Sequence, residues 1–141
     1  MAYKEDFINV DNCSAVDVST RLNNASGKVF LTLMREKGID IIIRYYASSA
    51  RPKTITPEEA KFLSKEGFGI LPVFQDSSRS IKDYSQLKGS ANAKSAMDFA
   101  KLVGQPKGKG STILFAVDAD FTSEQIDGPI LDYFQAIKDE I

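Results

Sequence analysis

The fold is decided by the segment Ile113-Leu114-Phe115-Ala116-Val117-Asp118-Ala119-Asp120-Phe121-Thr122. It is an apolar run, rich in residues that favour strands, and it ends abruptly in two aspartates. Because side chains alternate between the two faces of a strand, Asp118 and Asp120 are expected on one face. They would lie at the carboxyl end of a buried strand, where α/β folds place their active sites. Two carboxylates held close together are also typical of enzymes that hydrolyse glycosidic bonds.

Three earlier segments have the same apolar character. They predict strands over residues 14–18, 39–45 and 69–75. A helical pattern follows each of the four strands along the chain. Four strand–helix units in a row indicate an α/β fold, in which a parallel sheet is covered by helices.

The helices are expected at definite places. They are predicted from about Ser26, from the capping box at residues 56–59, over about Asn92 to Val103, and from Thr122 or Ser123. The first helix should bury an apolar stripe formed by Val29, Phe30, Leu33 and Met34. Gly128-Pro129 predicts a kink in the last helix. Residues 76–90 are left as one long irregular loop, and a loop of that length is often functional.

The predicted strands turn polar where they end. The polar residues are Asp17 on the first strand, Arg44 with Tyr45 and Tyr46 on the second, Gln75 with Asp76 on the third, and Asp118 with Asp120 on the fourth. Because parallel strands align their carboxyl ends, these side chains are expected to meet at one mouth. Ala15 and Ala116 share a face with the acids that follow them, so small residues would point into a tightly curved, barrel-like sheet.

Composition excludes several function classes. The net charge of −1, with both signs spread along 141 residues, offers no basic stripe for nucleic acid. The absence of histidine excludes Ser-His-Asp and Cys-His nucleophiles and the usual zinc sites. The single cysteine, Cys13, cannot form a disulfide within the chain and is expected to be a small buried residue. No apolar run is long enough to span a membrane, no secretory signal is visible, and no metal or cofactor is implied.

Five motifs, taken in order, carry a family resemblance. They are Ala-Val-Asp-Val-Ser-Thr from residue 15, Ile-Ile-Arg-Tyr-Tyr from 42, Thr-Pro-Glu-Glu-Ala from 56, Gly-Ile-Leu-Pro-Val-Phe-Gln from 69, and Ile-Leu-Phe-Ala-Val-Asp-Ala-Asp from 113. Together they resemble a bacterial glycoside-hydrolase-like domain of unknown function, a TIM barrel similar to muramidases of the Chalaropsis lysozyme type. The resemblance runs from about Val16 to Ile141. It implies a domain that binds or acts on a cell-wall polysaccharide such as peptidoglycan, in a secreted or cell-wall-associated protein.

The resemblance also implies roles for the acids. In a catalytic version, Asp120 would be the general acid that protonates the leaving oxygen. Asp118 would stabilise the positive charge of the transition state or position an N-acetyl group, and Asp17 would orient the pair. The expected substrate-binding residues are Arg44, Tyr46 and Gln75.

Structural roles are the alternatives for these residues. Asp120 could cap the last helix, and Gln75 could equally be a capping residue. Arg44 could form an ion pair with an acid at a neighbouring strand end. Alternation along the strand allows at most one of Tyr45 and Tyr46 to face the mouth, which leaves the other in the core.

Two departures from the muramidase pattern favour a different class of function. The usual Asp-x-Glu pair is Asp-x-Asp here, which shortens the reach of the proton donor by one methylene. An eight-unit barrel takes about 250 residues, whereas this chain supplies four units. We therefore predict a single domain over residues 1–141, the N-terminal half of a barrel, that either self-associates through its open edges or lacks its C-terminal half. The alternative function is a non-catalytic carbohydrate-binding or structural domain. A third possibility is an open, flavodoxin-like signalling sheet with its acids clustered for Mg²⁺.

Overall fold

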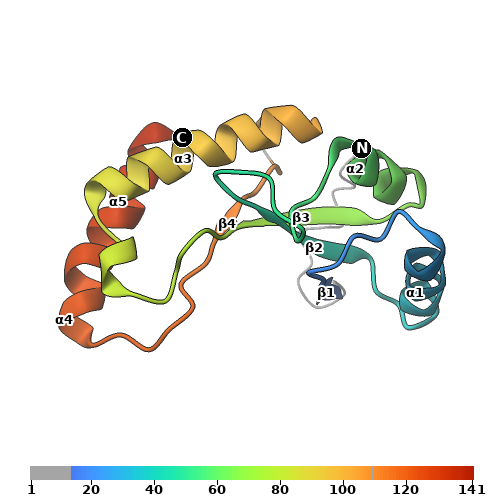
Figure 1. The fold of residues 1–141 in the computed structure, drawn as a ribbon, viewed down its shortest axis with the longest axis horizontal. Coiled ribbons are helices and arrows are strands. Elements are labelled where there is room, and N and C mark those ends of the chain that lie inside the picture. The colour runs from blue at the N-terminus through green and yellow to red at the C-terminus, as the bar shows by residue number, and fades with distance from the viewer. Residues whose placement is uncertain (1–13, 109) are drawn as a thin grey trace.

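A computed structural model describes residues 14–108 and 110–141, so Cys13 lies outside the described residues (Figure 1). The chain alternates between strands and helices. The elements are β1 (Ala15–Asp17), α1 (Ala25–Glu36), β2 (Ile41–Tyr46), α2 (Pro57–Lys65), β3 (Gly69–Phe74), the 3₁₀ helix η3 (Ile81–Asp83), α3 (Gln86–Val103), β4 (Leu114–Phe115), α4 (Ser123–Gln125), the π-helical η4 (Ile126–Ile130) and α5 (Leu131–Glu140).

The four strands form one parallel sheet in the order β1-β2-β3-β4. The sheet and its interleaved helices form a half-barrel of the TIM type, which confirms the predicted fold class. In a flavodoxin-like sheet, β1 would lie between β2 and β3, so that alternative is wrong. None of the described helices is long and apolar enough to cross a membrane.

The main core lies between the sheet and the helices on its outer side. Alternate residues of β2 face the helices and are fully buried, as Ile42 and Tyr46 illustrate. A smaller core joins α3 and α5 around Tyr84 and Tyr133. Figure 1 shows α1 and α2 at one end of the molecule and α3, α4 and α5 at the other, with the strands between them. The candidate site lies on the other, inner face of the sheet.

Helix α1 buries only part of the predicted stripe: Phe30 and Met34 pack against the core, but Val29 and Leu33 do not. Leu31 has an exposed fraction of 2%, whereas Val29 and Leu33 are 64% and 47% exposed. The buried side of the helix also contains Gly27, where an added Cβ would lie 1.9 Å from the carbonyl oxygen of Leu22. This close approach turns the Gly27–Leu31 side of the helix inward, so Val29 and Leu33 face outward instead.

Helix α3 begins about six residues earlier than predicted. Ser85 caps it by accepting a hydrogen bond from the Lys88 N–H at 3.1 Å. Gly89 allows α3 to approach α5 closely, because a Cβ there would lie 2.2 Å from the carbonyl oxygen of Tyr133. The long irregular loop therefore shrinks to the residues between β3 and α3, and it includes η3.

The last helical region is irregular at the place where a kink was predicted. Pro129 lies inside the π-helical segment η4, where the helix cannot keep its regular hydrogen bonds. The capping residue at its start is Thr122, whose side chain accepts from the Gln125 N–H at 3.3 Å. Asp120 therefore does not have the capping role that the sequence left open.

Strand β4 is shorter and less buried than predicted. It contains two residues, and Leu114 has an exposed fraction of 43% because no further strand pairs with this edge among the described residues. Ile137 and the exposed side chains of Phe134 and Ile141 line an apolar groove beside it. The edge therefore presents unpaired backbone groups next to apolar side chains.

We expect the 141-residue chain to self-associate through this edge, because open strands and exposed apolar patches favour pairing. Sedimentation velocity should show association that increases with concentration. Leu114→Lys should shift the protein toward the monomer, since a charge on an edge strand opposes pairing. Leu87→Lys, at an 84% exposed position on α3, is the matched control and should change nothing. A wild-type chain that stays monomeric at all concentrations would contradict the prediction.

Candidate functional site

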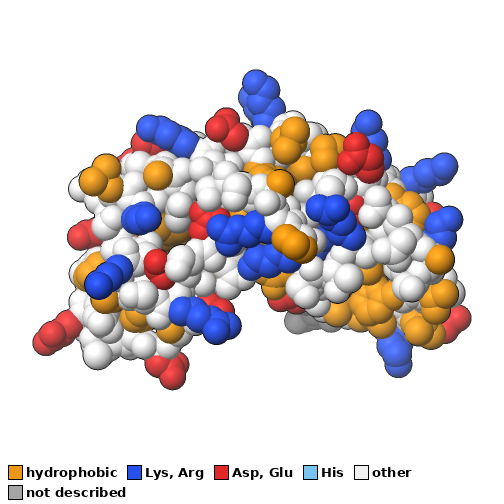
Figure 2. All heavy atoms as spheres, viewed as in Figure 1, with side chains coloured by type: hydrophobic (Ala, Val, Ile, Leu, Met, Phe, Trp, Pro, Cys, Tyr) orange, Lys and Arg blue, Asp and Glu red, His pale blue; other side chains and the backbone are white. Residues whose placement is uncertain are grey.

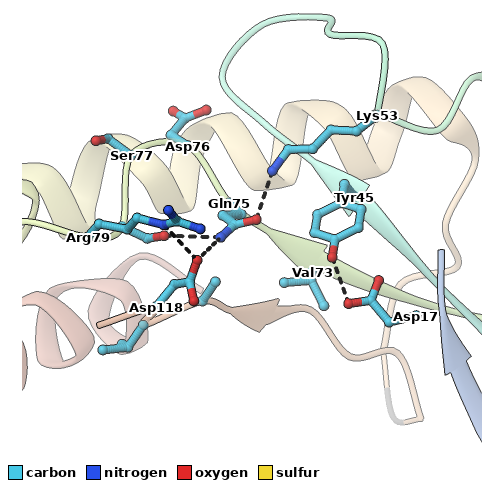
Figure 3. Close-up of a pocket in the computed structure, with 12 residues that line it drawn as sticks. Asp17, Tyr45, Lys53, Val73, Gln75, Asp76, Ser77, Arg79 and Asp118 are labelled. Atoms are coloured by element: carbon cyan, nitrogen blue, oxygen red, sulfur yellow. Dashed lines mark hydrogen bonds and ion pairs between the residues drawn. The ribbon is translucent and has the colours of Figure 1, made fainter. Parts of the chain in front are cut away.

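A cavity of about 640 Å³ opens on the inner face, at the carboxyl ends of the strands (Figure 3). This volume lies in the range of small-molecule sites in proteins. Most of the residues that line the cavity are polar, because the strands are followed by polar residues where they end. The lining residues are Asp17, Tyr45, Lys53, Val73, Gln75, Asp76, Ser77, Ser78, Arg79, Ala116, Val117 and Asp118.

Strand alternation and parallel register explain which residues reach the cavity. Tyr45 pairs with Val73 in the sheet, and both point inward from the face opposite the buried Tyr46 and Phe74. Ala116 lines the cavity as expected for a small inward-facing residue. Small inward-facing residues were predicted to give a tightly curved sheet, and such a sheet still has room for an open cavity at its mouth.

Asp17 and Tyr45 form one side of the cavity. The Tyr45 hydroxyl donates a hydrogen bond to Asp17 Oδ2 at 2.7 Å. Burial, together with the hydrogen bond and negative charge of Asp17, raises the pKa of Tyr45 to about 12. The phenol is therefore protonated at neutral pH and holds the Asp17 carboxylate in place.

We expect Tyr45 to titrate late in the folded protein. Because its folded pKa of about 12 lies above the ordinary value of 10.0, its contribution to stability is complete below pH 10 and is lost as the pH rises toward 12. Phenolate absorbance should show a late step that Tyr45→Phe diminishes. Asp17→Asn should move the step to lower pH, since it removes the negative charge. An identical alkaline titration in wild type and both variants would refute this assignment.

Gln75, Asp118 and two cations form the other side. The Gln75 amide nitrogen donates to Asp118 Oδ2 at 3.3 Å, and its oxygen accepts from Lys53 Nζ at 2.7 Å. Arg79 Nε donates to the same Asp118 oxygen at 3.2 Å. The arrangement links a carboxylate, an amide and two cations across three loops, as Figure 3 shows.

Tyr84 holds the loop after β3 against the end of β4. Its hydroxyl donates to the carbonyl oxygen of Ser78 at 2.7 Å and lies 3.3 Å from that of Ala116. The Asp118 N–H also donates to the Ser78 carbonyl, at 3.1 Å. Burial of the phenol raises the pKa of Tyr84 to about 12, so this donor is retained at neutral pH. The positions of Gln75 and Asp118 are therefore fixed relative to each other.

Asp76 connects the loop after β3 to the loop after β2. Its Oδ1 accepts from Arg51 Nη2 at 3.0 Å and from the Ser48 N–H at 2.9 Å. These bonds hold the segment that carries Lys53 next to the segment that carries Gln75. Asp76 was not among the predicted site residues, and its role here is to position the two loops.

Arg44 is corrected from a substrate ligand to a structural residue. Its side chain is fully buried on the helix-facing side of β2, where Nε and Nη2 each donate to the Glu59 carboxylate at 2.9 Å. Nη1 donates to the backbone oxygens of Val18 and Lys53. The sequence suggested an ion pair with Asp17 or Asp118, but the partner is Glu59 of α2.

Tyr46 is corrected in the same way. It faces the helices with an exposed fraction of 1%, and its hydroxyl donates to Gln105 Oε1 at 2.9 Å. Its ring packs against Phe99. Of the two adjacent tyrosines, Tyr45 reaches the cavity, whereas Tyr46 was predicted to bind the substrate.

The three predicted acids do not all meet. Asp17 and Asp118 line the cavity together with the predicted ligand Gln75. Asp120 is exposed and lies outside the set of lining residues. The structure therefore brings two of the three carboxylates into one site.

Two cations in the site were missed by the sequence analysis. Lys53 and Arg79 lie in the loops after β2 and β3, not at strand ends, and basic residues in loops are usually solvated. Arg79 lies within the long loop predicted over residues 76–90, whereas the only signal for Lys53 was its position after a strand. With Asp17, Asp76 and Asp118, the lining has three formal negative charges and two positive ones. Among the described residues, no group of three His, Cys, Asp or Glu side chains could hold a metal ion.

Comparison with known proteins identifies relatives. The model of the Rv2525c-like, glycoside hydrolase-like domain family matches residues 32–141. A Bacillus subtilis (strain 168) protein, the uncharacterized protein YbfG, is 28% identical over 131 residues, which cover 89% of this chain. The match covers 17% of that relative, so this chain spans about a sixth of its length.

Solved structures resemble the half-barrel. Crystal structures of the Mycobacterium tuberculosis Tat-secreted protein Rv2525c, in complex with HEPES and with L-tartrate, match 87% of this chain at a TM-score of 0.70 and 23% identity. The modular autolysin LytC from Streptococcus pneumoniae, in complex with a synthetic peptidoglycan ligand, matches 89% of it at a TM-score of 0.56 and 15% identity. This chain covers 61% and 60% of the two Rv2525c chains and 29% of the LytC chain. At these identities, the likeness shows the fold alone.

Proposed function

From the premise that this chain belongs to the family of Rv2525c-like glycoside hydrolase-like domains, we propose that its inner-face cavity binds a bacterial cell-wall polysaccharide of the peptidoglycan type. The observation that carries the proposal is the convergence of Asp17, Gln75 and Asp118 around one open cavity at the carboxyl ends of parallel strands. The likeness to LytC, whose structure contains a synthetic peptidoglycan ligand, supports the choice of polymer.

The free polar atoms of the cavity suit a ligand rich in hydroxyl groups. Asp118 uses Oδ2 for its bonds to Gln75 and Arg79, and Asp17 uses Oδ2 for its bond to Tyr45. In the described part of the chain, the Oδ1 atoms of both aspartates have no hydrogen-bond partner, so each can accept from a sugar hydroxyl. A carboxylate that accepts from a hydroxyl forms a strong, charge-assisted bond.

The site draws on all four strand ends or the loops that follow them. We therefore propose that residues 1–141 act as one domain that corresponds to the first four units of a (β/α)8 barrel. The four strands belong to one sheet, and residues from the segments after β2, β3 and β4 meet at the cavity.

Hydrolysis of the bound glycan is the second candidate function, favoured by the pair of carboxylates in the cavity. In that mechanism, Asp118 stabilises the oxocarbenium-like charge, Asp17 orients the pair, and Asp120 protonates the leaving oxygen. Both Asp17 and Asp118 serve as hydrogen-bond acceptors here, and Asp120 would have to turn into the cavity to act as a donor. Binding without cleavage therefore fits the geometry better.

Cosedimentation with purified peptidoglycan sacculi tests the proposal. Wild type should bind saturably, and Gln75→Ala should weaken binding, because it removes the amide that joins Lys53 to Asp118. Gln135→Ala, on the exposed surface of α5, is the matched control and should bind as wild type does. No binding by wild type, or equal losses in both variants, would count against this site.

A further inference from the structure

We propose that the cavity recognises a saccharide that carries a carboxylate, and that Lys53 is the residue that reads this charge. This inference rests on the proposed polysaccharide binding and adds the chemical class of the ligand. It follows from three observations: how Lys53 is paired, how it is held, and which charges surround it.

Within the part of the chain that the structure describes, Lys53 has no carboxylate partner. Its ammonium group donates to the neutral amide oxygen of Gln75 at 2.7 Å and lies 4.5 Å from the centre of the Tyr45 ring. Of the described carboxylates, none lies within ion-pair distance of it, although Asp17, Asp76 and Asp118 line the same cavity. The side chain is half-buried, so part of its hydration is lost, and the negative charges of Asp118, Asp17 and Asp76 offset this loss only in part.

The backbone of Lys53 is held in place. Its carbonyl oxygen accepts from Arg44 Nη1 at 3.0 Å, and that guanidinium is fixed by the buried Glu59. The neighbouring Thr54 is buried and forms an isolated parallel β-bridge with Tyr45 of β2. These contacts fix the backbone of Lys53, and the hydrogen bond to Gln75 directs its ammonium group into the cavity. A mobile surface lysine would have none of these constraints.

Burial affects the charge of the lysine as well as its position. Loss of solvent, and secondarily the positive charge of Arg51, lower the pKa of Lys53. A ligand carboxylate beside the ammonium group would stabilise its charged form more than the cavity lining alone does. The energetic gain is larger for a partly desolvated pair than for one on the open surface.

Arg79 supplies a second cation at the rim. Only its Nε is used, in the bond to Asp118, and its side chain is 82% exposed. Such an exposed pair contributes little and can exchange partners at small cost. Figure 2 shows basic side chains gathered over the middle of the molecule, above the hollow between its two ends.

The surrounding acids limit the charge of the ligand. With three carboxylates and two cations, the cavity lining is already negative by one formal charge. With Lys53 already counted, a carboxylate placed beside its ammonium group brings the formal charge to −2, whereas a doubly charged phosphate would bring it to −3 and be repelled more strongly by Asp17, Asp76 and Asp118. The balance therefore favours a carboxylate over a phosphate.

Matched sugar pairs test the inference by NMR titration of the full chain. N-acetylmuramic acid against N-acetylglucosamine tests a carboxylate on a lactyl group, and glucuronic acid against glucose tests one on the sugar ring. At least one acid should bind about tenfold more tightly than its neutral partner, as a charge-assisted bond predicts. Lys53→Met should abolish this preference. Lys61→Met, at an exposed position on α2, is the matched control and should retain it.

The outcomes separate this inference from the proposed function. Equal binding of acidic and neutral sugars, or an unchanged preference in Lys53→Met, would overturn the role of Lys53. Tighter binding of inorganic phosphate than of either acid would overturn the choice of carboxylate. If sacculi bind normally in any of these cases, the polysaccharide-binding function stands alone; if neither sacculi nor any sugar binds, both proposals fail.

Discussion

Glu59→Ala is expected to lower the free energy of unfolding by about 3–5 kcal/mol, the cost of leaving a buried charge without its partner. Arg44 and Glu59 are both 0% exposed and form two hydrogen bonds of 2.9 Å. The Glu59 carboxylate also accepts from the Leu22 N–H at 3.0 Å. The substitution therefore leaves a desolvated guanidinium and an unpaired backbone donor in the core.

Urea unfolding followed by circular dichroism measures this effect. Glu58→Ala is the matched control, because Glu58 is the exposed neighbour in the first turn of α2 and should cost less than about 1 kcal/mol. A double variant, Arg44→Met with Glu59→Leu, should be more stable than Glu59→Ala, since it removes both charges together. Equal losses for Glu58→Ala and Glu59→Ala would show that the pair is not buried in solution.

The same ion pair links the core to the candidate site. Arg44 Nη1 donates to the carbonyl oxygens of Val18, just beyond β1, and Lys53, in the loop after β2. Asp17 and Lys53 are therefore positioned by a side chain that never reaches the cavity. A variant that loosens Arg44 should weaken ligand binding as well as stability.

Much of the fold could be predicted from the sequence because its signals are local. The apolar runs marked β2 and β3 nearly to the residue, and Thr56 caps α2 as its motif predicted, with its oxygen accepting from the Glu59 N–H at 3.2 Å. Alternation placed Ala116, Asp118 and Asp120 on one face: Ala116 and Asp118 line the cavity, whereas Asp120 does not, because β4 ends at Phe115 and alternation does not extend that far beyond the strand. These features depend on neighbours in the chain, which the sequence contains.

The direction of Arg44 and Tyr46 could not be predicted because β2 is apolar on both faces. Residues 41–43 are all isoleucine, so no alternation of polar and apolar side chains marks which face meets the helices. Glu59 did not indicate a partner for Arg44 either, because its position in the capping box at residues 56–59 already explained its presence. In the structure its carboxylate accepts hydrogen bonds from Arg44 and Leu22 instead, and both residues are distant from Glu59 in the sequence.

A similar ambiguity applies to Gly89. A glycine within a polar stretch favours a loop when only its own propensity is considered. Here it is the contact point between α3 and α5, and the gain from packing the two helices outweighs the propensity cost of about 1 kcal/mol.

Asp118→Asn is expected to weaken the binding of peptidoglycan sacculi about 10- to 100-fold, the range for loss of a charged hydrogen-bond acceptor. The amide keeps the shape of the side chain but removes its charge and one acceptor. Asp120→Asn makes the same chemical change two residues away, outside the cavity lining, and should leave affinity within about twofold of wild type. Cosedimentation over a range of sacculus concentrations gives both values. Equal losses in the two variants would mean that the cavity does not distinguish these acids.

Release of soluble sugar from the same sacculi decides between binding and cleavage. Because Asp120 lies outside the cavity lining and Asp118 is already paired with Arg79, we expect wild type to bind without releasing fragments. Release by wild type that Asp120→Asn abolishes, with binding intact, would instead identify Asp120 as the proton donor, because an amide cannot protonate the leaving oxygen. The shorter reach of Asp relative to Glu would then be offset by movement of the segment after β4. The contrast between two neighbouring acids, one in the cavity and one outside it, thus separates recognition of the glycan from chemistry on it.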